Sequence, residues 1–314
     1  MDAQTSGINT FPHQPVLYHE SLKYLQLESG NHFIDGTLGA GGHAFGILTN
    51  TSPHTELLAF DLDKQALAIA RDRLKKLTER IIFKHQSYAS MKEVVNQLGW
   101  GCADGIILDL GISSMQVDHP ERGFSFLHEA PLDMRFNQSR GQTAADLLNS
   151  MDENEIADII WKFGDEPRSR RIAKFIVDDR PVETTSQLAG IVQKAYRGYR
   201  TKAHPATKTF QAVRIAVNSE LEVLKQGLKS ALATLCTGGR LAVITFHSLE
   251  DRIVKRLFKT EAKDCICPAE QMICTCDHKA SIMIITKKPV IPSKEEVERN
   301  PRARSAKLRV AEKI

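Results

Sequence analysis

Residues 33–43 read FIDGTLGAGGH and carry a strong structural signal. Two apolar residues, Phe33 and Ile34, lead to Asp35, then to a glycine-rich turn and an apolar helical stretch. Because glycine adopts backbone conformations that other residues avoid, this pattern predicts a buried strand, a tight turn and a helix N-terminus. Backbone amides at such a terminus, with no β-carbons above them, suit the close approach of an adenosine-bearing ligand.

The same alternation of strand and helix continues after this turn. Further short apolar runs are expected as strands at 57–60, 81–83, 105–110, 240–246, 281–286 and 306–310. A helix with apolar residues at helical spacing is expected over 67–77, a long amphipathic one over 210–228 that ends at Gly238 and Gly239, and another over 249–258. Strands that alternate with helices predict an α/β fold with a doubly wound, Rossmann-like parallel sheet.

The alternation stops between 118 and 204, where the pattern changes to loops and helices. Asp152 followed by Glu155 predicts a helix N-cap with its reciprocal partner. We therefore expect a discontinuous cofactor-binding domain, residues 1–117 and 205–314, interrupted by a smaller helical domain over 118–204 that serves substrate recognition.

Composition bounds the class of protein. The chain has 314 residues, 42% of them hydrophobic, and a formal net charge of +4, which predicts a globular protein that tolerates a polyanionic partner. With no apolar run long enough for a membrane span and a polar start, we expect a cytoplasmic protein without membrane contact. Six cysteines are expected as reduced thiols, with Cys102 and Cys236 as small apolar residues.

An acidic residue follows the next strand at the distance expected for a ribose contact. Asp61 stands twenty residues after Gly41. Gly39-x-Gly41-x-x-Ala44 also fits a dinucleotide fingerprint, so a nicotinamide-dependent oxidoreductase stays open, as does a purely structural turn. Asp109, suited to an adenine amino group, and two closing strands favour S-adenosylmethionine.

Nine segments carry a resemblance to a known family. They are HxPVLxxE (13–20), DGTLGAGGH (35–43), LDLGISSxQ (108–116), RGFSF (122–126), PLDMR (131–135), HPAT (204–207), FQAVR (210–214), FHSLEDR (246–252) and NPRARS (300–305). Together they resemble the bacterial small-subunit ribosomal RNA methyltransferase H family, also called MraW-like. The resemblance implies N4-methylation of a cytidine in the decoding region of 16S rRNA, with S-adenosylmethionine as the methyl donor.

The resemblance also implies positions for the cofactor. They are Gly41, Gly42, His43, Asp61, Tyr88, Asp109 and Gln116, to which we add Asp35 and Gly39 from the same turn. Tyr88 stands where the family often has phenylalanine, and it keeps the aromatic face. The implied partner is small-subunit rRNA or an assembling 30S subunit, and the chain is expected as a monomer or a homodimer.

The chemistry requires acceptors for the protons of a poorly nucleophilic amino group. Ser113 and Ser114 follow the fourth strand, and His247 follows the fifth, so we expect them in the crevice at the carboxyl ends of the strands. Helix or turn capping is the alternative for each of them. A non-enzymatic RNA-binding protein with a vestigial cofactor fold also stays open.

Basic residues are candidates for RNA contact. Residues 190–219 contain no acidic residue, and arginines crowd the C-terminus. The candidates are Arg135, Lys194, Arg197, Arg200, Lys208, Arg214, Arg302 and Arg304. For Arg135 a salt bridge with Asp133 is the alternative, and for the others a solvated helix face.

Cys265, Cys267, Cys274 and Cys276 supply enough soft ligands for tetrahedral zinc. Two C-x-C pairs are a weaker signal than two C-x-x-C pairs. The expected chemistry needs no metal, so free thiols in a loop are favoured and no metal site is assigned.

Overall fold

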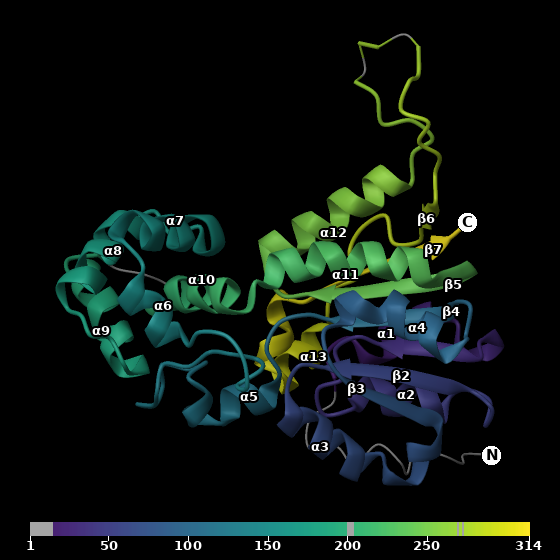
Figure 1. Ribbon diagram of the computed structural model, residues 1–314, viewed down its shortest axis with the longest axis horizontal. Helices are drawn as coiled ribbons and strands as arrows, with labels where there is room; N and C mark the ends of the chain where they lie inside the picture. The colour runs from purple at the N-terminus through teal and green to yellow at the C-terminus, as the bar shows by residue number, and fades with distance from the viewer. Residues whose placement is uncertain (1–14, 200–203, 269, 272) are drawn as a thin grey trace. The chain divides into compact units, whose positions relative to one another are not determined.

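The computed structural model describes residues 15–199, 204–268, 270–271 and 273–314 (Figure 1). Its contacts divide the chain into two compact units. Unit 1 comprises Met1–Gly111 and Leu224–Ile314, and unit 2 comprises Ile112–Val223. The inserted unit is therefore wider at both ends than the expected 118–204. Its C-terminal end lies further along the chain because helix α10 (Ala206–Asn218) packs with the other helices of unit 2.

Unit 1 is built on a seven-stranded sheet with the order β3-β2-β1-β4-β5-β7-β6. The strands are β1 (His32–Asp35), β2 (Glu56–Asp61), β3 (Ile81–His85), β4 (Ala103–Asp109), β5 (Leu235–Thr245), β6 (Ile282–Ile284) and β7 (Lys307–Lys313). The first five are parallel, and β7 runs antiparallel between β5 and β6. The predicted α/β class and the two closing strands are confirmed, and these two strands pair as an antiparallel hairpin.

Both faces of the central strands are buried, which explains their continuous apolar runs. Phe33 points into one core and the adjacent Ile34 into the other, and Leu57 and Leu58 alternate in the same way. Helices cover the two faces. The first core takes side chains from α1 (Tyr18–Leu25), α2 (Gly42–Thr49) and α3 (Lys64–Arg73), and the second from α4 (Met91–Leu98), α11 (Glu220–Thr234) and α12 (Ser248–Glu261).

Short segments complete unit 1 between these elements. They are the 3-10 helices η2 (Leu27–Ser29), η3 (Lys75–Arg80), η4 (Tyr88–Ser90) and η6 (Pro301–Ser305), and helix α13 (Lys294–Arg299). Among the described residues, no helix has both the length and the apolar character to cross a membrane.

Unit 2 is helical and has a hydrophobic core of its own. Besides α10 it contains α5 (Ser114–Asp118), η5 (Pro120–Arg122), α6 (Ala144–Ser150), α7 (Glu153–Gly164), α8 (Ser169–Asp178) and α9 (Thr185–Ala195). The predicted capping box at the start of α7 is confirmed: Asp152 accepts a hydrogen bond from the Glu155 backbone N–H, and Glu155 accepts one in return.

The expected long helix over 210–228 is wrong. Ser219 has a φ of 49°, in the left-handed region, and it separates α10 from α11. Gly238 and Gly239 do not end a helix either, because they lie within β5, where the pairing register with β4 shifts. Hydrophobic spacing alone continues through such a break, since apolar positions on both sides are buried.

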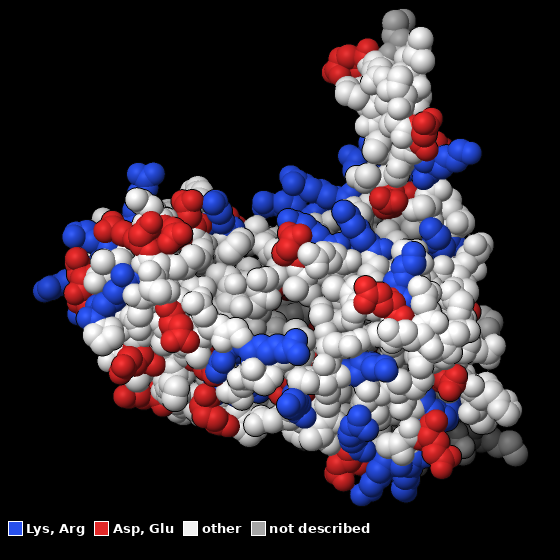
Figure 2. Space-filling view, viewed as in Figure 1, with Lys and Arg blue, Asp and Glu red and all other residues white. Residues whose placement is uncertain are grey.

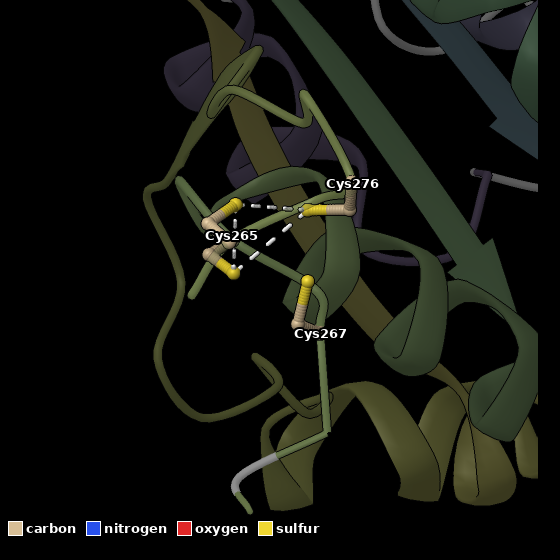
Figure 3. Close-up of side chains that lie close together, drawn as sticks. Cys265, Cys267 and Cys276 are labelled. Atoms are coloured by element: carbon tan, nitrogen blue, oxygen red, sulfur yellow. Dashed lines mark hydrogen bonds between the residues drawn. The ribbon is translucent and has the colours of Figure 1, made fainter. Parts of the chain in front are cut away.

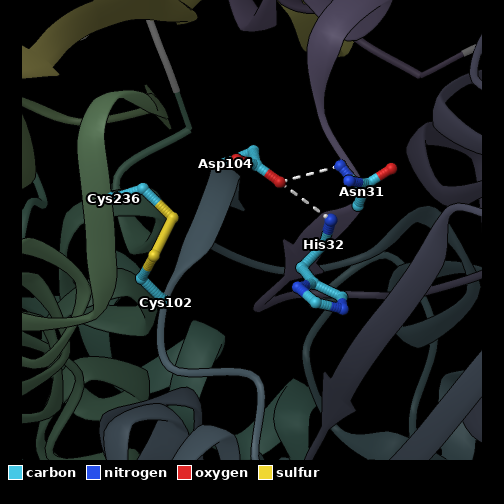
Figure 4. Close-up of a disulfide and its surroundings, with 5 residues drawn as sticks. All are labelled: Asn31, His32, Cys102, Asp104 and Cys236. Atoms are coloured by element: carbon cyan, nitrogen blue, oxygen red, sulfur yellow. Dashed lines mark hydrogen bonds between the residues drawn. A yellow bond between two sulfur atoms is a disulfide. The ribbon is translucent and has the colours of Figure 1, made fainter.

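The expectation of reduced thiols is wrong at two positions. Cys102, just before β4, and Cys236, the second residue of β5, form a disulfide (Figure 4). Each cysteine stands alone in the sequence, so nothing in its spacing indicated a partner. The other four cysteines are free.

Candidate active site

Three aspartates end three neighbouring parallel strands of unit 1. Asp35 is the last residue of β1, Asp61 of β2 and Asp109 of β4. Because these strands are parallel and adjacent in the sheet, the three carboxylates gather at one edge. This is the edge at which open α/β sheets bind their ligands.

Asp61 holds the glycine turn. One carboxylate oxygen accepts a hydrogen bond from the Gly39 N–H at 2.8 Å, and the other accepts one from the Asp63 N–H at 2.8 Å. Burial raises the pKa of Asp61 to about 6, against the lowering effect of these backbone bonds. Each oxygen retains a second lone pair, so the carboxylate can also accept from a ligand hydroxyl.

Several buried polar atoms at this edge have no hydrogen-bond partner among the described residues. They are Oδ2 of Asp35, Oδ1 of Asp109 and both ring nitrogens of His43. His43 lies in the first turn of α2, and its Nε2 is 3.6 Å from Oδ2 of Asp109. Asp35 is 1% exposed, and burial raises its pKa to about 7, against the lowering effect of His43.

An unsatisfied buried polar atom costs about 1–3 kcal/mol, so native proteins leave few of them. Four such atoms on three residues of one strand edge therefore indicate that a ligand supplies their partners. Donor and acceptor groups are both present, which fits the adenosyl and amino-acid parts of S-adenosylmethionine.

The glycines of the turn serve different purposes. Gly39 has a φ of 50°, and a β-carbon there would meet nothing closer than 4.0 Å. A β-carbon on Gly41, whose φ is 81°, would lie 2.9 Å from Leu74, and one on Gly42 would lie 2.3 Å from Pro15. Only Gly39 thus leaves open space, whereas the other two permit close internal packing.

Tyr88 lies in η4 and is half-buried beside two further glycines. A β-carbon on Gly36 would be 3.0 Å from the Tyr88 β-carbon, and one on Gly227 would be 2.1 Å from the ring. The aromatic ring is therefore fixed by α11 packing directly against it.

Ser113 and Gln116 form the capping box of α5 in unit 2. The Ser113 hydroxyl accepts from the Gln116 N–H at 3.2 Å, and Oε1 of Gln116 accepts from the Ser113 N–H at 3.1 Å. The capping alternative thus describes Ser113. Ser114 is half-buried, and its hydroxyl makes no hydrogen bond within the described part of the chain.

His247 caps α12 in unit 1. Its Nδ1 accepts from the Glu250 N–H at 3.4 Å, and its Nε2 lies 3.1 Å from Oε1 of Glu250. Both ring nitrogens therefore face the same glutamate, which also accepts from the His247 N–H. The capping alternative describes this residue as well.

Several of the basic candidates in unit 2 are engaged within the protein. Arg135 forms a two-pronged salt bridge with Asp133, at 2.8 and 2.9 Å. Arg214 binds Glu220 in the same way, with both side chains largely buried. The pairing lowers the pKa of Asp133, against the raising effect of burial.

The other candidates lie at the surface. Lys194 pairs with Asp179, and Lys208 donates to the Asp165 carbonyl. Arg197, Arg302 and Arg304 are exposed. Arg200 lies outside the described residues.

A basic surface on α12 was missed by the sequence reasoning. Figure 2 shows Lys and Arg side chains gathered over this helix. They include the exposed Arg252, Lys255, Arg256 and Lys259, which we call the α12 basic face. Their spacing of three and four residues was the signal that could have found it.

Comparison with known proteins gives near full-length matches. A family model described as "MraW methylase family" matches residues 10–314. A protein named Ribosomal RNA small subunit methyltransferase H from Geobacter sulfurreducens is 50% identical over 310 residues, 97% of this chain and 100% of the relative. One of the same name from Dehalococcoides mccartyi strain BAV1 is 48% identical over 304 residues, 97% of this chain and 87% of the relative.

Solved structures are less similar. A putative rRNA-methylase from Clostridium thermocellum aligns with a TM-score of 0.47 at 11% identity, covering 96% of this chain and 100% of that chain. A putative methyltransferase from Streptococcus mutans, in complex with SAH, aligns with a TM-score of 0.44 at 12% identity, covering 94% and 97%.

Proposed function

The chain belongs to the MraW methylase family, and from this membership we propose that it methylates small-subunit ribosomal RNA at the exocyclic N4 of a cytidine in the decoding region. The assignment of an RNA substrate rests on one observation. The chain is similar, over almost its whole length, to relatives named ribosomal RNA small subunit methyltransferase H. S-adenosylmethionine is the methyl donor of this family, as expected from the glycine turn and Asp61.

Most of the residues that would hold the cofactor lie on unit 1, and Gln116 lies on unit 2. Asp61 accepts from ribose hydroxyls while it holds the Gly39 amide, and Asp109 accepts from the adenine amino group. Asp35 and His43 supply the remaining unpartnered polar atoms, and Tyr88 presents its ring beside the turn. When bound, the cofactor supplies an activated methyl group on a sulfonium ion.

Of the three expected groups, we propose Ser114 as the hydrogen-bond acceptor for the cytosine amino group. Ser113 and His247 already serve as helix caps, so we assign them to positioning. The Ser114 hydroxyl is free to accept a hydrogen bond from an amino N–H of the cytosine, which helps to localise the nitrogen lone pair for attack on the methyl carbon. As the N–C bond forms and the S–C bond breaks, the nitrogen becomes positively charged, and its extra proton is then lost to solvent. Gln116 stabilises the same short helix through the capping box.

The RNA must present its target base unpaired, because the amino group of a paired cytosine is engaged. Unit 2 is the proposed RNA-recognition domain, with Arg197 as a phosphate contact. Arg302 and Arg304 of unit 1 are further proposed phosphate contacts. Arg135 and Arg214 are assigned to shaping unit 2 rather than to phosphates, since their guanidinium groups are held by carboxylates. The α12 basic face adds a phosphate-binding surface.

The test is methyl transfer by the purified chain to 30S subunits and to free 16S rRNA, followed by mass spectrometry of the nucleosides. We expect N4-methylcytidine, and we expect the same nucleoside to be missing from rRNA of cells that lack the gene. The Asp61→Asn variant should lose most of the activity, while the matched Asp72→Asn variant, altered at an exposed site on α3, should keep it.

Other outcomes would identify the alternatives. Methylation at a different atom would keep the methyltransferase and overturn the cytidine N4 assignment. RNA binding with no methylated product under any condition would favour the vestigial-fold alternative. Tight binding of a nicotinamide dinucleotide in place of S-adenosylmethionine would favour the oxidoreductase.

A further inference from the structure

The segment between α12 and β6 is long and has no helix or strand in its described residues. It extends away from the sheet (Figure 1). Hydrogen bonds close its base, where Ser281 donates from its N–H to the Glu261 carbonyl at 2.8 Å and from its hydroxyl to the Glu261 carboxylate at 2.9 Å. Beyond the base, Ile266 and Ile273 are 47% and 77% exposed. Burial of these two apolar side chains therefore does not hold the described part of the loop in shape.

Four cysteines come together in this loop. The four-cysteine cluster consists of Cys265, Cys267, Cys274 and Cys276 (Figure 3). All four are free thiols, exposed or partly exposed, and their sulfur atoms lie within 4.8 Å of one another. Because the cluster lies at the surface, burial in a hydrophobic core does not account for the close approach of these four sulfurs.

The sulfur distances match those of a metal tetrathiolate. Cys265 and Cys274 have their sulfurs 3.5 Å apart, Cys274 and Cys276 3.6 Å, and Cys276 and Cys265 3.8 Å. Zinc–sulfur bonds of about 2.3 Å in a regular tetrahedron place the sulfurs about 3.8 Å apart. Three edges of that tetrahedron are therefore present, and a small movement of the Cys267 side chain completes it.

The surroundings of the cluster also suit a metal. The Ile266 N–H donates to the Cys276 sulfur at 3.4 Å, a bond that stabilises a sulfur carrying negative charge. His278 is engaged elsewhere, since its Nε2 lies 3.1 Å from the Thr260 carbonyl oxygen. The donor set is thus four thiolates, which zinc favours and which hard cations such as magnesium do not.

We propose that the four-cysteine cluster binds one zinc ion that fixes the loop between α12 and β6. Four protein ligands leave no open coordination position, so the site is structural and stands apart from methyl transfer. This reverses the preference for idle thiols that the C-x-C spacing suggested, because the spatial arrangement supplies what the spacing lacked. Metal binding would offset the conformational entropy lost on ordering a loop without a core.

The first experiment is elemental analysis of protein purified without chelator. We expect one zinc per chain in the wild type and a loss of the metal in the Cys274→Ser/Cys276→Ser double variant. The matched control is Cys102→Ser/Cys236→Ser, which removes two cysteines outside the cluster and should retain one zinc. Iron in place of zinc would overturn the identity of the metal.

A second experiment keeps the proposal testable if the cysteine variants fold poorly. Wild-type protein stripped of metal is titrated with cobalt(II), and we expect the intense thiolate-to-cobalt absorption of a tetrahedral site at one equivalent. Added zinc should abolish it and should protect the loop from limited proteolysis. Less than about 0.1 metal per chain, with no cobalt absorption and four titratable thiols, would overturn the proposal.

Discussion

Two aspartates on the same strand meet opposite conditions. Asp104, near the start of β4, accepts hydrogen bonds from the N–H groups of Asn31 and His32 at 2.8 and 3.0 Å (Figure 4). Asp109, at the end of β4, has a buried oxygen without a partner in the described structure. Oδ2 of Asp104 thus accepts two backbone hydrogen bonds that tie the start of β1 to β4, whereas Oδ1 of Asp109 accepts none in the described structure.

The contrast separates structural from functional polar groups without reference to residue type. A carboxylate oxygen that accepts from backbone N–H groups contributes to stability. A buried carboxylate with an empty oxygen lowers stability unless a ligand fills it, and it persists because the ligand requires it. The amino and carboxyl ends of the sheet differ in this respect.

The largest expected effect is on cofactor affinity, when each of the two aspartates is replaced by alanine in a separate variant. Asp109→Ala should weaken S-adenosylmethionine binding by about 10- to 100-fold, because it removes a charged hydrogen-bond acceptor worth about 1.5–3 kcal/mol. Asp104→Ala should leave this affinity unchanged and lower the free energy of unfolding by about 1–2 kcal/mol. Isothermal titration calorimetry and urea unfolding measure the two quantities.

The opposite pattern of effects in the two variants would contradict this comparison. A large loss of affinity in Asp104→Ala with a normal stability would mean that hydrogen-bond satisfaction does not identify the cofactor edge.

The next effect concerns pH. Burial raises the pKa of Asp35 from 3.8 to about 7. The folded protein therefore holds this proton more tightly than the unfolded chain does. The contribution of Asp35 to the free energy of unfolding is fully present below about pH 4 and is lost as the pH rises through 7. Relative to Asp35→Asn, the ligand-free wild type should lose about 2 kcal/mol of unfolding free energy between about pH 5 and pH 8. Urea unfolding across this range measures the difference.

Asp72→Asn is the control for removing one carboxylate, since Asp72 is 82% exposed. A constant difference between wild type and Asp35→Asn at every pH would show that Asp35 ionises normally in the folded protein.

The smallest expected effect is that of replacing His247. It tests whether a residue takes part in catalysis merely because it lies at the carboxyl end of a strand. His247 lies just beyond β5, yet both its ring nitrogens face Glu250. His247→Ala should lower the free energy of unfolding by about 1 kcal/mol through the lost cap, and His247→Asn should restore most of it. Single-turnover methyl transfer by His247→Asn should stay within about threefold of the wild type. A loss of activity in a stable His247→Asn protein would place the imidazole in the reaction.

Local patterns were sufficient to predict much of unit 1. Short apolar runs located the strands, and the glycine turn with Asp61 located the edge of the sheet where the three aspartates gather, because both depend on residues close together in the chain. The capping box of Asp152 and Glu155 was predictable for the same reason. The functional roles of the site residues stay predictions until they are tested.

Pairings between side chains were not predictable. The basic run that includes Arg214 ends at Ser219, and the next residue, Glu220, engages that arginine. The Cys102–Cys236 bond joins residues separated by 134 positions, and the break at Ser219 depends on a single backbone angle. Each of these features depends on the folded structure, and the spacing of residues along the sequence does not indicate it.

The Cys102–Cys236 bond has a topological consequence. The disulfide closes a covalent ring from residue 102 to residue 236. All of Ile112–Val223, and hence the whole of unit 2, belongs to this ring. A protease that nicks unit 2 once would therefore open the ring and release no fragment. The nicked molecule would keep its mass on a denaturing gel until a reductant separates it into two pieces.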